Sequence, residues 1–275
     1  MDFRSDALEI LKQTSRTFYI PIVRLPDKLQ LAVASAYLCM RAIDEVEDSD
    51  VLSTEVKAKL LREISGTLQS QSHDFKRKDP FAEIFEPYSD FLPEVTLRIN
   101  EWSLLADCTI APRIWDATAA MSDRMAYWAE CNWLVLSKED LDRYTFSVAG
   151  AVGLLLSDLW AWYDGTNTNR SWAIGFGRGL QAVNILRNRA EDSKRGVNFY
   201  PQGWEEADMI AYARHNLNLG QQYNEALGDS PAKDFCSIPL ALAFGTLEAI
   251  ALGKGKLSRH DVLSLVEKLI NKKSA

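Results

Sequence analysis

Apolar residues recur every three or four positions along most of this chain, and the alternation that marks a β-strand is scarce. The longest such stretch begins at Pro26-Asp27 and runs to Glu47. Further helices are predicted over residues 6–13, 54–68, 93–105, 114–133, 138–163, 171–192, 205–227, 237–252 and 260–271. Pro239 is expected in the first turn of its helix, where a missing N–H costs nothing. The pattern predicts an all-α protein.

One domain is the economical interpretation of the chain, spanning residues 1–275. No linker rich in Pro, Gly or Ser divides it, and no solenoid-like repeat is visible. Its longest apolar run, 148–162, is interrupted by Gly150, Gly153 and Asp158 and falls short of the ~18 residues that span a bilayer. The first sixteen residues lack the apolar core of a signal peptide. We therefore expect a soluble, cytoplasmic protein.

Charge and reactive side chains exclude several function classes. A formal charge of −7 argues against a general nucleic-acid binder, which needs a basic face to neutralise phosphates. The four cysteines have no C-x-x-C spacing, as expected of reduced cytosolic thiols. Three histidines, far apart in sequence, give little support to a histidine-based zinc site or a Ser-His-Asp triad.

A pair of carboxylates ends the long helix predicted to begin at Pro26. Asp44 and Asp48 are one turn apart on one helical face, about 6 Å along the axis. Their mutual repulsion is relieved when a cation lies between them, and Mg²⁺ prefers such hard oxygen ligands. Arg41, one turn earlier on that face, can hold a phosphate oxygen. Alone the motif is weak evidence, because acidic clusters at helix ends are usually solvated surface.

A second polar stripe crosses the helix predicted over 171–192. Spacings of 3, 4 and 4 place four side chains on one face, namely Gln181, Asn184, Asn188 and Asp192. Apolar residues fall between them, so part of this helix is buried, and buried polar groups need partners. A hydrogen-bond network within the protein is one explanation, and a metal-bound anion is the other. Two such helices in one chain favour a shared cation site.

Glycines interrupt two helical patterns, at 148–153 and 175–179. Each costs about 1 kcal/mol relative to alanine in a helix interior. Either they let helix backbones approach closely, or they keep a cavity clear of side chains for a long apolar ligand. The polar motifs beside them favour the second explanation.

Four segments in a fixed order identify a resemblance: Ser15-Arg16-Thr17-Phe18-Tyr19, Tyr37-x-x-x-Arg41-x-x-Asp44-x-x-x-Asp48, Tyr144 through Gly153, and Gln181-x-x-Asn184-Ile-Leu-Arg187 through Asp192. The chain resembles the squalene and phytoene synthase family, the head-to-head trans-prenyltransferases, over nearly its full length. The resemblance implies an all-α class I isoprenoid synthase fold, a single-domain helical bundle around a central cavity. It also implies that farnesyl or geranylgeranyl diphosphate is bound through Mg²⁺ bridging the two motifs.

The resemblance also implies roles for individual residues. The implied metal ligands are Asp44, Asp48, Asn188 and Asp192. The residues implied to bind or orient the diphosphate substrate are Ser15, Arg16, Thr17, Phe18, Arg41, Tyr144, Gln181, Asn184 and Arg187. Gly150, Gly153 and Gly177 would line the prenyl tunnel. The chemistry is ionisation of an allylic C–O bond, which metal ions and arginines assist by stabilising charge on the leaving diphosphate.

The second motif departs from the family pattern. The family reads R-D-x-x-x-D, but here asparagine is at position 188, and an amide carbonyl lacks the charge that offsets Mg²⁺ desolvation. The family then reads G-R-x-Y-L-P, whereas this chain has Gly196-Val197-Asn198-Phe199-Tyr200-Pro201. An arginine and a phenolic hydroxyl are thus absent, unless Tyr200 replaces the latter. These losses should impair the condensation of two substrates more than the ionisation of a single one.

The favoured hypothesis is therefore a farnesyl diphosphate phosphatase that releases farnesol. The alternative is a squalene, dehydrosqualene or phytoene synthase that tolerates Asn188. An inactive helical scaffold is a third interpretation, against which the intact Asp44 and Asp48 argue. Reductive chemistry would need a nicotinamide site, yet 175–179 does not complete G-x-G-x-x-G. Peripheral membrane contact is compatible with an apolar product, although no exposed amphipathic anchor stands out, and the oligomeric state cannot be deduced.

Overall fold

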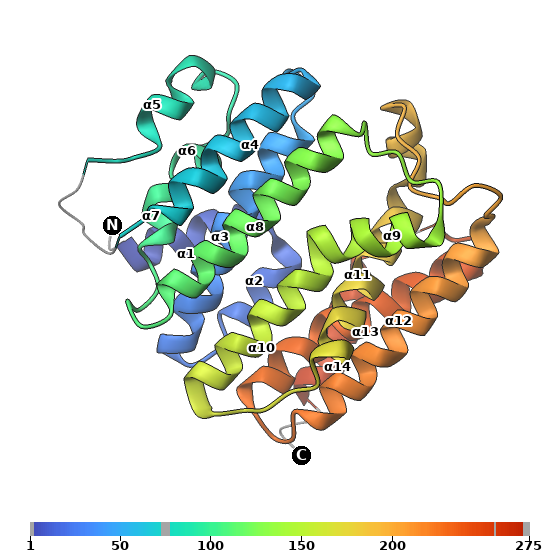
Figure 1. Ribbon diagram of the computed structural model, residues 1–275. Helices are drawn as coiled ribbons and strands as arrows, with labels where there is room; N and C mark the ends of the chain where they lie inside the picture. Colours follow the sequence, from blue (N-terminus) through green and yellow to red (C-terminus); the bar gives the residue numbers. More distant parts are fainter. Residues whose placement is uncertain (1–2, 73–77, 256, 272–275) are drawn as a thin grey trace. The chain divides into compact units, whose positions relative to one another are not determined.

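The computed structural model describes residues 3–72, 78–255 and 257–271, and these form helices joined by turns, without a strand (Figure 1). The prediction of an all-α fold is confirmed. Two compact units share the chain. The first comprises Met1–Asn132 and Asp158–Gly165, and the second comprises Trp133–Ser157 and Thr166–Ala275. The expectation of one domain over residues 1–275 stays a prediction.

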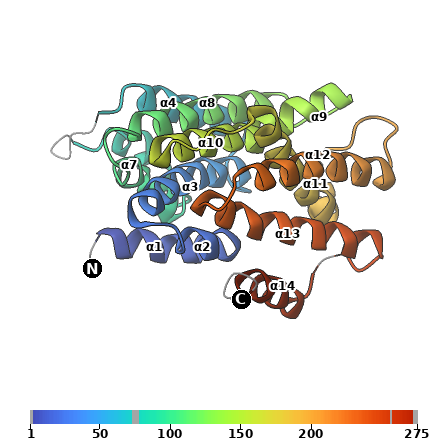
Figure 2. The same cartoon turned by 90° about the horizontal axis from the view of Figure 1, so that it is seen from below.

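The first unit is built around a long central helix, α3. Its elements are α1 (Phe3–Thr14), α2 (Arg16–Ile22), α3 (Asp27–Asp48), α4 (Thr54–Gln69), α5 (Ala82–Phe85), η1 (Glu86–Tyr88), α6 (Glu94–Leu97), α7 (Ile99–Ser103) and α8 (Ala111–Glu130). Helices α3, α4 and α8 lie side by side, and α1, α6 and α7 also pack on α3 (Figures 1 and 2). The buried hydroxyl of Ser35 donates to the Trp102 carbonyl at 2.7 Å, and that of Thr96 donates to the Ala42 carbonyl at 2.9 Å. These bonds fix α3 against α6 and α7.

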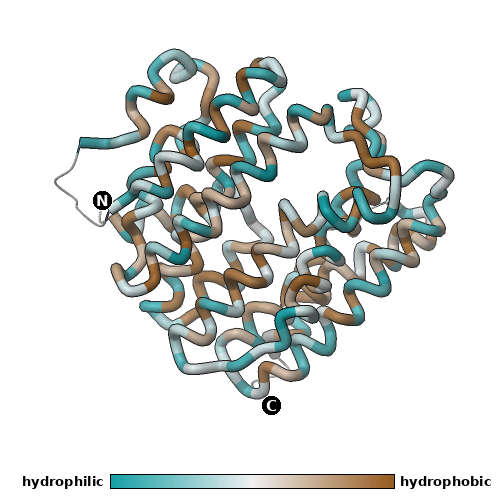
Figure 3. The backbone as a smooth tube through the Cα atoms, in the orientation of Figure 1, coloured by the Kyte–Doolittle hydropathy of each residue, from teal (hydrophilic) through white to brown (hydrophobic). Residues whose placement is uncertain are grey.

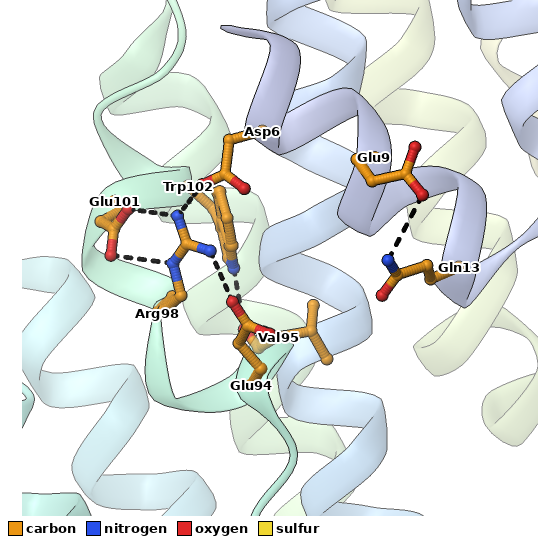
Figure 4. A network of polar contacts seen from close by, with 8 residues as sticks. All are labelled: Asp6, Glu9, Gln13, Glu94, Val95, Arg98, Glu101 and Trp102. Atoms are coloured by element: carbon orange, nitrogen blue, oxygen red, sulfur yellow. Dashed lines mark hydrogen bonds and ion pairs between the residues drawn. The ribbon is translucent and has the colours of Figure 1, made fainter. Parts of the chain in front are cut away.

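The predicted helix over 93–105 is divided in two at Arg98. This residue leaves the helical conformation, with φ −102° and ψ 19°. Its guanidinium pairs with Glu94 and Glu101 on either side and with Asp6 of α1 (Figure 4). It also lies 4.5 Å above the Trp102 ring. The break thus turns Arg98 into a tie between α1 and this segment, which helical periodicity could not predict.

The second unit begins with one long helix that contains a wider turn. Its elements are α9 (Lys138–Thr145), the π-helical turn η2 (Phe146–Gly150), the start of α10 (Ala151–Asp164), α11 (Arg170–Lys194), α12 (Glu206–Ala226), α13 (Pro231–Ala251) and α14 (Arg259–Asn271). Helix α11 packs on η2, α12 and α13, and α14 packs on α13 (Figure 2). Continuous helix over 138–163 is confirmed, apart from the π turn, which the sequence pattern did not indicate.

Pro239 lies in the interior of α13, so its expected place in the first turn is wrong. The helix begins eight residues earlier, because Ser230 accepts a hydrogen bond from the Lys233 N–H and Pro231 occupies the first turn. A serine followed by proline is the stronger start signal, and it precedes Pro239 in the chain.

Glycines in the second unit serve backbone contact between helices. A Cβ built on Gly153 would lie 2.2 Å from the carbonyl oxygen of Ala173, and one on Gly177 would lie 2.2 Å from that of Ala149. A Cβ on Gly150 would meet Ile174 at 3.2 Å. Backbone and side chains already fill these spaces. Close packing thus accounts for these three glycines, and their predicted place along a prenyl tunnel stays a prediction.

The opposite face of α11 repeats this arrangement against α12. A Cβ on Gly175 would lie 2.6 Å from Leu219, and one on Gly179 would lie 2.8 Å from the backbone nitrogen of Leu217. From α12, a Cβ on Gly220 would lie 2.7 Å from the Phe176 ring. Helix α11 is thus in close contact with neighbours on two faces, which holds its polar stripe in a fixed rotation.

Two helical stretches, Lys138–Asp164 and Pro231–Ala251, are long and apolar enough to cross a membrane by length and composition. Within their most apolar windows, 44% and 56% of residues are buried. Polar and apolar residues are interspersed along most helices (Figure 3). Since core helices pass the same test, the two stretches are weak evidence for a membrane span.

Candidate active site

The end of α3 forms the first half of the candidate site. The Arg41 guanidinium donates to Asp44 through one terminal nitrogen and to Glu45 through the other. Its Nε is buried and makes no hydrogen bond. Arg41 is therefore held by two carboxylates of its own helix, whereas the sequence suggested only that it could contact a phosphate. Glu45 was not among the predicted site residues.

Asp44 carries the clearest electrostatic signature in this half. Its pKa is raised from 3.8 to about 7, first by burial, then by the charge of Asp48, with a smaller contribution from Glu45. The charge and hydrogen bond of Arg41 act in the opposite direction without cancelling the rise. Asp48, one turn on, is exposed. The end of α3 thus carries more negative charge than Arg41 neutralises, as expected of a place for a cation.

Helix α2, which precedes α3 in the chain, contacts it through Ser15 and Phe18. Ser15 caps α2 by accepting the Phe18 N–H at 3.2 Å. The Tyr37 hydroxyl interacts with Ser15, and burial is the main reason that the pKa of Tyr37 is raised. The rings of Phe18 and Tyr37 are 5.7 Å apart, and Thr17 is exposed. The start of α2 is thus tied to α3 one turn before Arg41, while the side chain of Arg16 lies outside the described part of the structure.

The polar stripe of α11 forms the second half of the candidate site. Some of its side chains hydrogen-bond to one another or to a neighbour on the same helix. Asn184 donates to the Gln181 side-chain oxygen at 3.5 Å, and the Nε of Arg187 donates to the Asn188 side-chain oxygen at 3.1 Å. The amide oxygen that was predicted to bind metal is therefore engaged by its neighbour. Arg187 is exposed, and the three amide side chains are half-buried.

Asp192, the last member of the stripe, is 8% exposed. Its carboxylate accepts a hydrogen bond from Arg195 at 2.9 Å. Its backbone carbonyl accepts the Val197 N–H at 3.0 Å, and the Gly196 N–H binds the Ser193 carbonyl at 3.1 Å. With Gly196 at φ +75°, this is a Schellman end to the helix. The segment that lacks the family arginine thus holds the backbone of Asp192 in place.

Two aromatic residues, Phe199 and Tyr200, follow the stripe in the segment that departs from the family pattern. Phe199 stacks on Tyr144 with ring centroids 4.4 Å apart. The Tyr200 ring lies 4.3 Å beneath the Arg189 guanidinium, and burial raises the pKa of its hydroxyl. Phe199, without a hydroxyl, is therefore the neighbour of Tyr144, and Tyr200 is engaged with Arg189.

The donor sets of the two halves fit Mg²⁺ rather than a fully protein-bound metal. Among residues 3–72, 78–255 and 257–271, no three His, Cys, Asp or Glu side chains converge into a metal site. Each half offers one or two carboxylates, and Mg²⁺ is commonly held by so few, with water and substrate phosphates completing its shell. Asp44 and Asp48 belong to the first unit, and Asn188 and Asp192 to the second. Their meeting around one cavity stays a prediction.

Three polar residues that the sequence did not single out are linked to one another in the second unit, at the helix turn that carries Tyr144. Tyr212 of α12 donates to Asp142 at 2.8 Å, and Arg178 of α11 donates to the Asp142 backbone carbonyl at 3.0 Å. These partners are separated by 70 and 36 positions. Sequence spacing carries no signal for contacts of that kind.

A sequence model of the squalene/phytoene synthase family matches residues 11–207. Among curated proteins, a squalene synthase of Schizosaccharomyces pombe is 29% identical over 273 residues. The match covers 88% of this chain and 58% of that protein. The chain spans 58–63% of the length of the curated squalene synthases compared with it.

Solved structures are similar over almost the whole chain. TcSQS in complex with the ligand E5700 superposes with a TM-score of 0.77 and 22% identity, covering 97% of this chain and 85% of that one. A dehydrosqualene synthase in complex with a ligand superposes with a TM-score of 0.68 and 20% identity, covering 100% of this chain and 97% of that one. At such identities the likeness shows the fold, which is the all-α fold implied by the sequence motifs.

Proposed function

This chain belongs to the squalene/phytoene synthase family, and from that premise we propose that it condenses two prenyl diphosphates head to head. The observation that carries the proposal is the extent of the match. Residues 11–207 include the Asp44/Asp48 pair on α3 and the polar stripe that ends at Asp192 on α11. A family that acts on prenyl diphosphates supports the same substrate class here, with farnesyl diphosphate as the proposed substrate.

The phosphatase hypothesis has no support among the relatives, which are squalene synthases, or among the similar structures. It depended on Asn188 and on the segment 196–201. In the structure that segment caps α11 and packs Phe199 on Tyr144, so its departures have structural roles. Asn188 keeps a side-chain oxygen on the stripe, in contact with Arg187. The alternative hypothesis is therefore preferred.

In the proposed reaction, Asp44, Asp48 and Asp192 would hold Mg²⁺, with Asn188 as a neutral donor. When bound, the metal supplies electrostatic stabilisation to the oxygens of the leaving diphosphate. Arg41 and Arg187 are placed beside the carboxylates and the amide that would bind it. Tyr144, held against Phe199, presents a fixed ring on the second unit. Condensation further requires that water, which would capture the carbocation as an alcohol, be kept from the bound prenyl chains.

Product analysis tests the proposal. The purified chain is incubated with farnesyl diphosphate and Mg²⁺, with and without a reduced nicotinamide, and extracts are analysed for hydrocarbons and alcohols. A thirty-carbon hydrocarbon is expected, together with its loss in Asp44→Asn. Farnesol as the sole product would overturn the proposal and restore the phosphatase. Release of no diphosphate at all would favour an inactive scaffold.

A further inference from the structure

The π turn Phe146–Gly150 interrupts the helix that carries Tyr144 and Gly153. A π turn replaces the regular i→i−4 bonds with longer rings, so it is less stable than the α-helix around it and often occurs at functional sites. Tyr144 is two residues before the turn. The position of its ring therefore depends on whatever holds the turn in place.

A chain of hydroxyl groups holds the start of the turn to α12. The Tyr212 hydroxyl donates to a carboxylate oxygen of Asp142 at 2.8 Å and lies 3.0 Å from the hydroxyl of Thr145. Thr145, the residue just before the turn, is fully buried. Since Tyr212 has one proton and gives it to Asp142, the Thr145 hydroxyl must be the donor in the contact between the two hydroxyls. The order is Thr145 to Tyr212 to Asp142, ending on a charged acceptor.

Helix α11 fixes the same turn from its other side. Arg178 donates to the Asp142 backbone carbonyl at 3.0 Å, and one of its terminal nitrogens lies 3.8 Å from the Asp142 carboxylate. The preceding residue is Gly177. A Cβ built on it would lie 2.2 Å from the carbonyl oxygen of Ala149 in the π turn. Burial is the main cause of the raised pKa of Tyr212, so its hydroxyl remains a proton donor at neutral pH. Both α11 and α12 thus hold the turn through contacts within the second unit.

We propose that Tyr212 is a positioning residue for prenyl transfer, acting through Thr145 and Asp142 to fix the π turn and thereby the ring of Tyr144. The inference rests on the proposed function, because the value of a fixed Tyr144 is its orientation toward the diphosphate. Tyr212 itself acts only through Tyr144. Small displacements of an orienting group cost one to two orders of magnitude in rate, because catalysis depends on alignment.

The chain contains a matched control for the loss of one phenolic hydroxyl. Tyr223, on the same face of α12, is buried like Tyr212, and its hydroxyl lies 3.0 Å from Ser157 of α10. The hydroxyls of Thr145 and Ser157 each also lie within hydrogen-bond distance of the carbonyl four residues earlier, at 2.7 and 3.0 Å. Thr145 therefore shares its single proton between that carbonyl and Tyr212, whereas either hydroxyl can donate in the contact of Ser157 with Tyr223. The two tyrosines thus share a hydroxyl–hydroxyl contact of the same length, and Tyr212 in addition donates to the Asp142 carboxylate. The Thr145 contact adjoins the π turn, and the Ser157 contact lies two turns beyond it.

Tyr212→Phe and Tyr223→Phe are compared in steady-state kinetics with farnesyl diphosphate and in urea unfolding. We expect both variants to lose stability, Tyr212→Phe more because it also gives up the hydrogen bond to Asp142, but a kcat lowered about tenfold only in Tyr212→Phe, with KM changed much less. Thr145→Val should reproduce the effect, and Thr145→Ser, which keeps the hydroxyl, should restore activity. In a Tyr144→Phe background, Tyr212→Phe should lower kcat little further, because both changes remove one function. Equal kcat in Tyr212→Phe and Tyr223→Phe would overturn the proposal.

Amide hydrogen exchange separates this proposal from the proposed function. Exchange over residues 146–151 should be faster in Tyr212→Phe than in the wild type and unchanged in Tyr223→Phe, whether or not the chain forms a thirty-carbon product. Failure of the wild type to form that product would overturn the proposed function alone. Unchanged exchange in Tyr212→Phe would overturn the positioning role alone.

Discussion

The carbonyl oxygen of Ala173 occupies the space that a side chain on Gly153 would need, because a Cβ there would lie 2.2 Å from it. Helices α10 and α11 thus meet backbone to backbone within the second unit. Gly177 and Ala149 form the reciprocal contact one turn away on each helix. Helix α11, which carries the polar stripe, is fixed in rotation by this pair of contacts.

Gly153→Ala should destabilise the protein by about 1–3 kcal/mol or more, because the backbone cannot yield as a flexible side chain can. Gly66→Ala is the matched control. Gly66 is an exposed glycine within α4 with nothing within 4 Å of an added Cβ. Its replacement should raise the free energy of unfolding by up to about 1 kcal/mol. Urea unfolding of the two variants checks the prediction, and a Gly153→Ala midpoint equal to that of the wild type would contradict the close crossing.

The contribution of Asp44 to the stability of the metal-free protein should fall as pH rises from 3.8 to about 7. In that window the folded protein keeps the Asp44 proton and the unfolded chain has released it. The folded state binds more protons, so the free energy of unfolding decreases with increasing pH. Asp44→Asn removes this contribution. In the presence of a chelator, the wild type should therefore lose more stability between pH 5 and pH 8 than Asp44→Asn does, and equal losses would show that Asp44 titrates normally.

Mg²⁺ together with inorganic pyrophosphate should raise the Tm of the wild type by roughly 5 °C when present at about a hundred times the Kd. The shift should grow as pH rises through about 7, because the metal binds the deprotonated carboxylate of Asp44. Asp44→Asn should lose the shift. Asp50→Asn, which changes an exposed carboxylate beyond the end of α3, should keep it. A full shift in Asp44→Asn would remove this residue from the metal site.

Asn188→Asp should lower the Mg²⁺ concentration needed for half-maximal activity by roughly tenfold, the order associated with changes around metal ligands. The new carboxylate adds charge on the stripe and can still accept the hydrogen bond of Arg187, now at 3.1 Å. Titration of activity with Mg²⁺ at fixed farnesyl diphosphate measures the effect. Asn184→Asp, on the same face one turn earlier, tests whether any added charge suffices. If both variants respond alike, position 188 has no special relation to the metal.

Much of the fold follows from helical periodicity. The helix expected from Pro26 to Glu47 is observed as Asp27–Asp48, and the helix expected over 171–192 is observed as Arg170–Lys194. Periodicity failed where a local polar contact breaks a helix, as at Arg98. It also failed for α2, which has seven residues with Pro21 inside and is too short to show a period.

The candidate site was predictable to the extent that its members share one helix. Asp44 and Asp48 are one turn apart on α3, and Gln181 through Asp192 lie on α11. Partners that come from distant segments, such as Tyr212 for Asp142, were not predictable, since no spacing rule connects positions 70 residues apart. The function of the glycines was also undecidable, because a missing side chain can admit a ligand or another backbone. The structure shows that the backbone of a neighbouring helix occupies the space beside Gly153 and Gly177.

The π turn also fixes a phase relation along its helix. Each α-helical residue advances the chain by about 100°, and a π turn accommodates roughly one residue more than the α-helix in the same length. Residues before Phe146 are thus out of register with those after Gly150. Deleting one residue between them, with return to an ordinary helix, would keep the face that Tyr144 presents relative to Gly153, whereas straightening the turn without a deletion would rotate Tyr144 by roughly 100°. A relative with a plain helix here should therefore align with a one-residue gap, and should present the same face at the position of Tyr144.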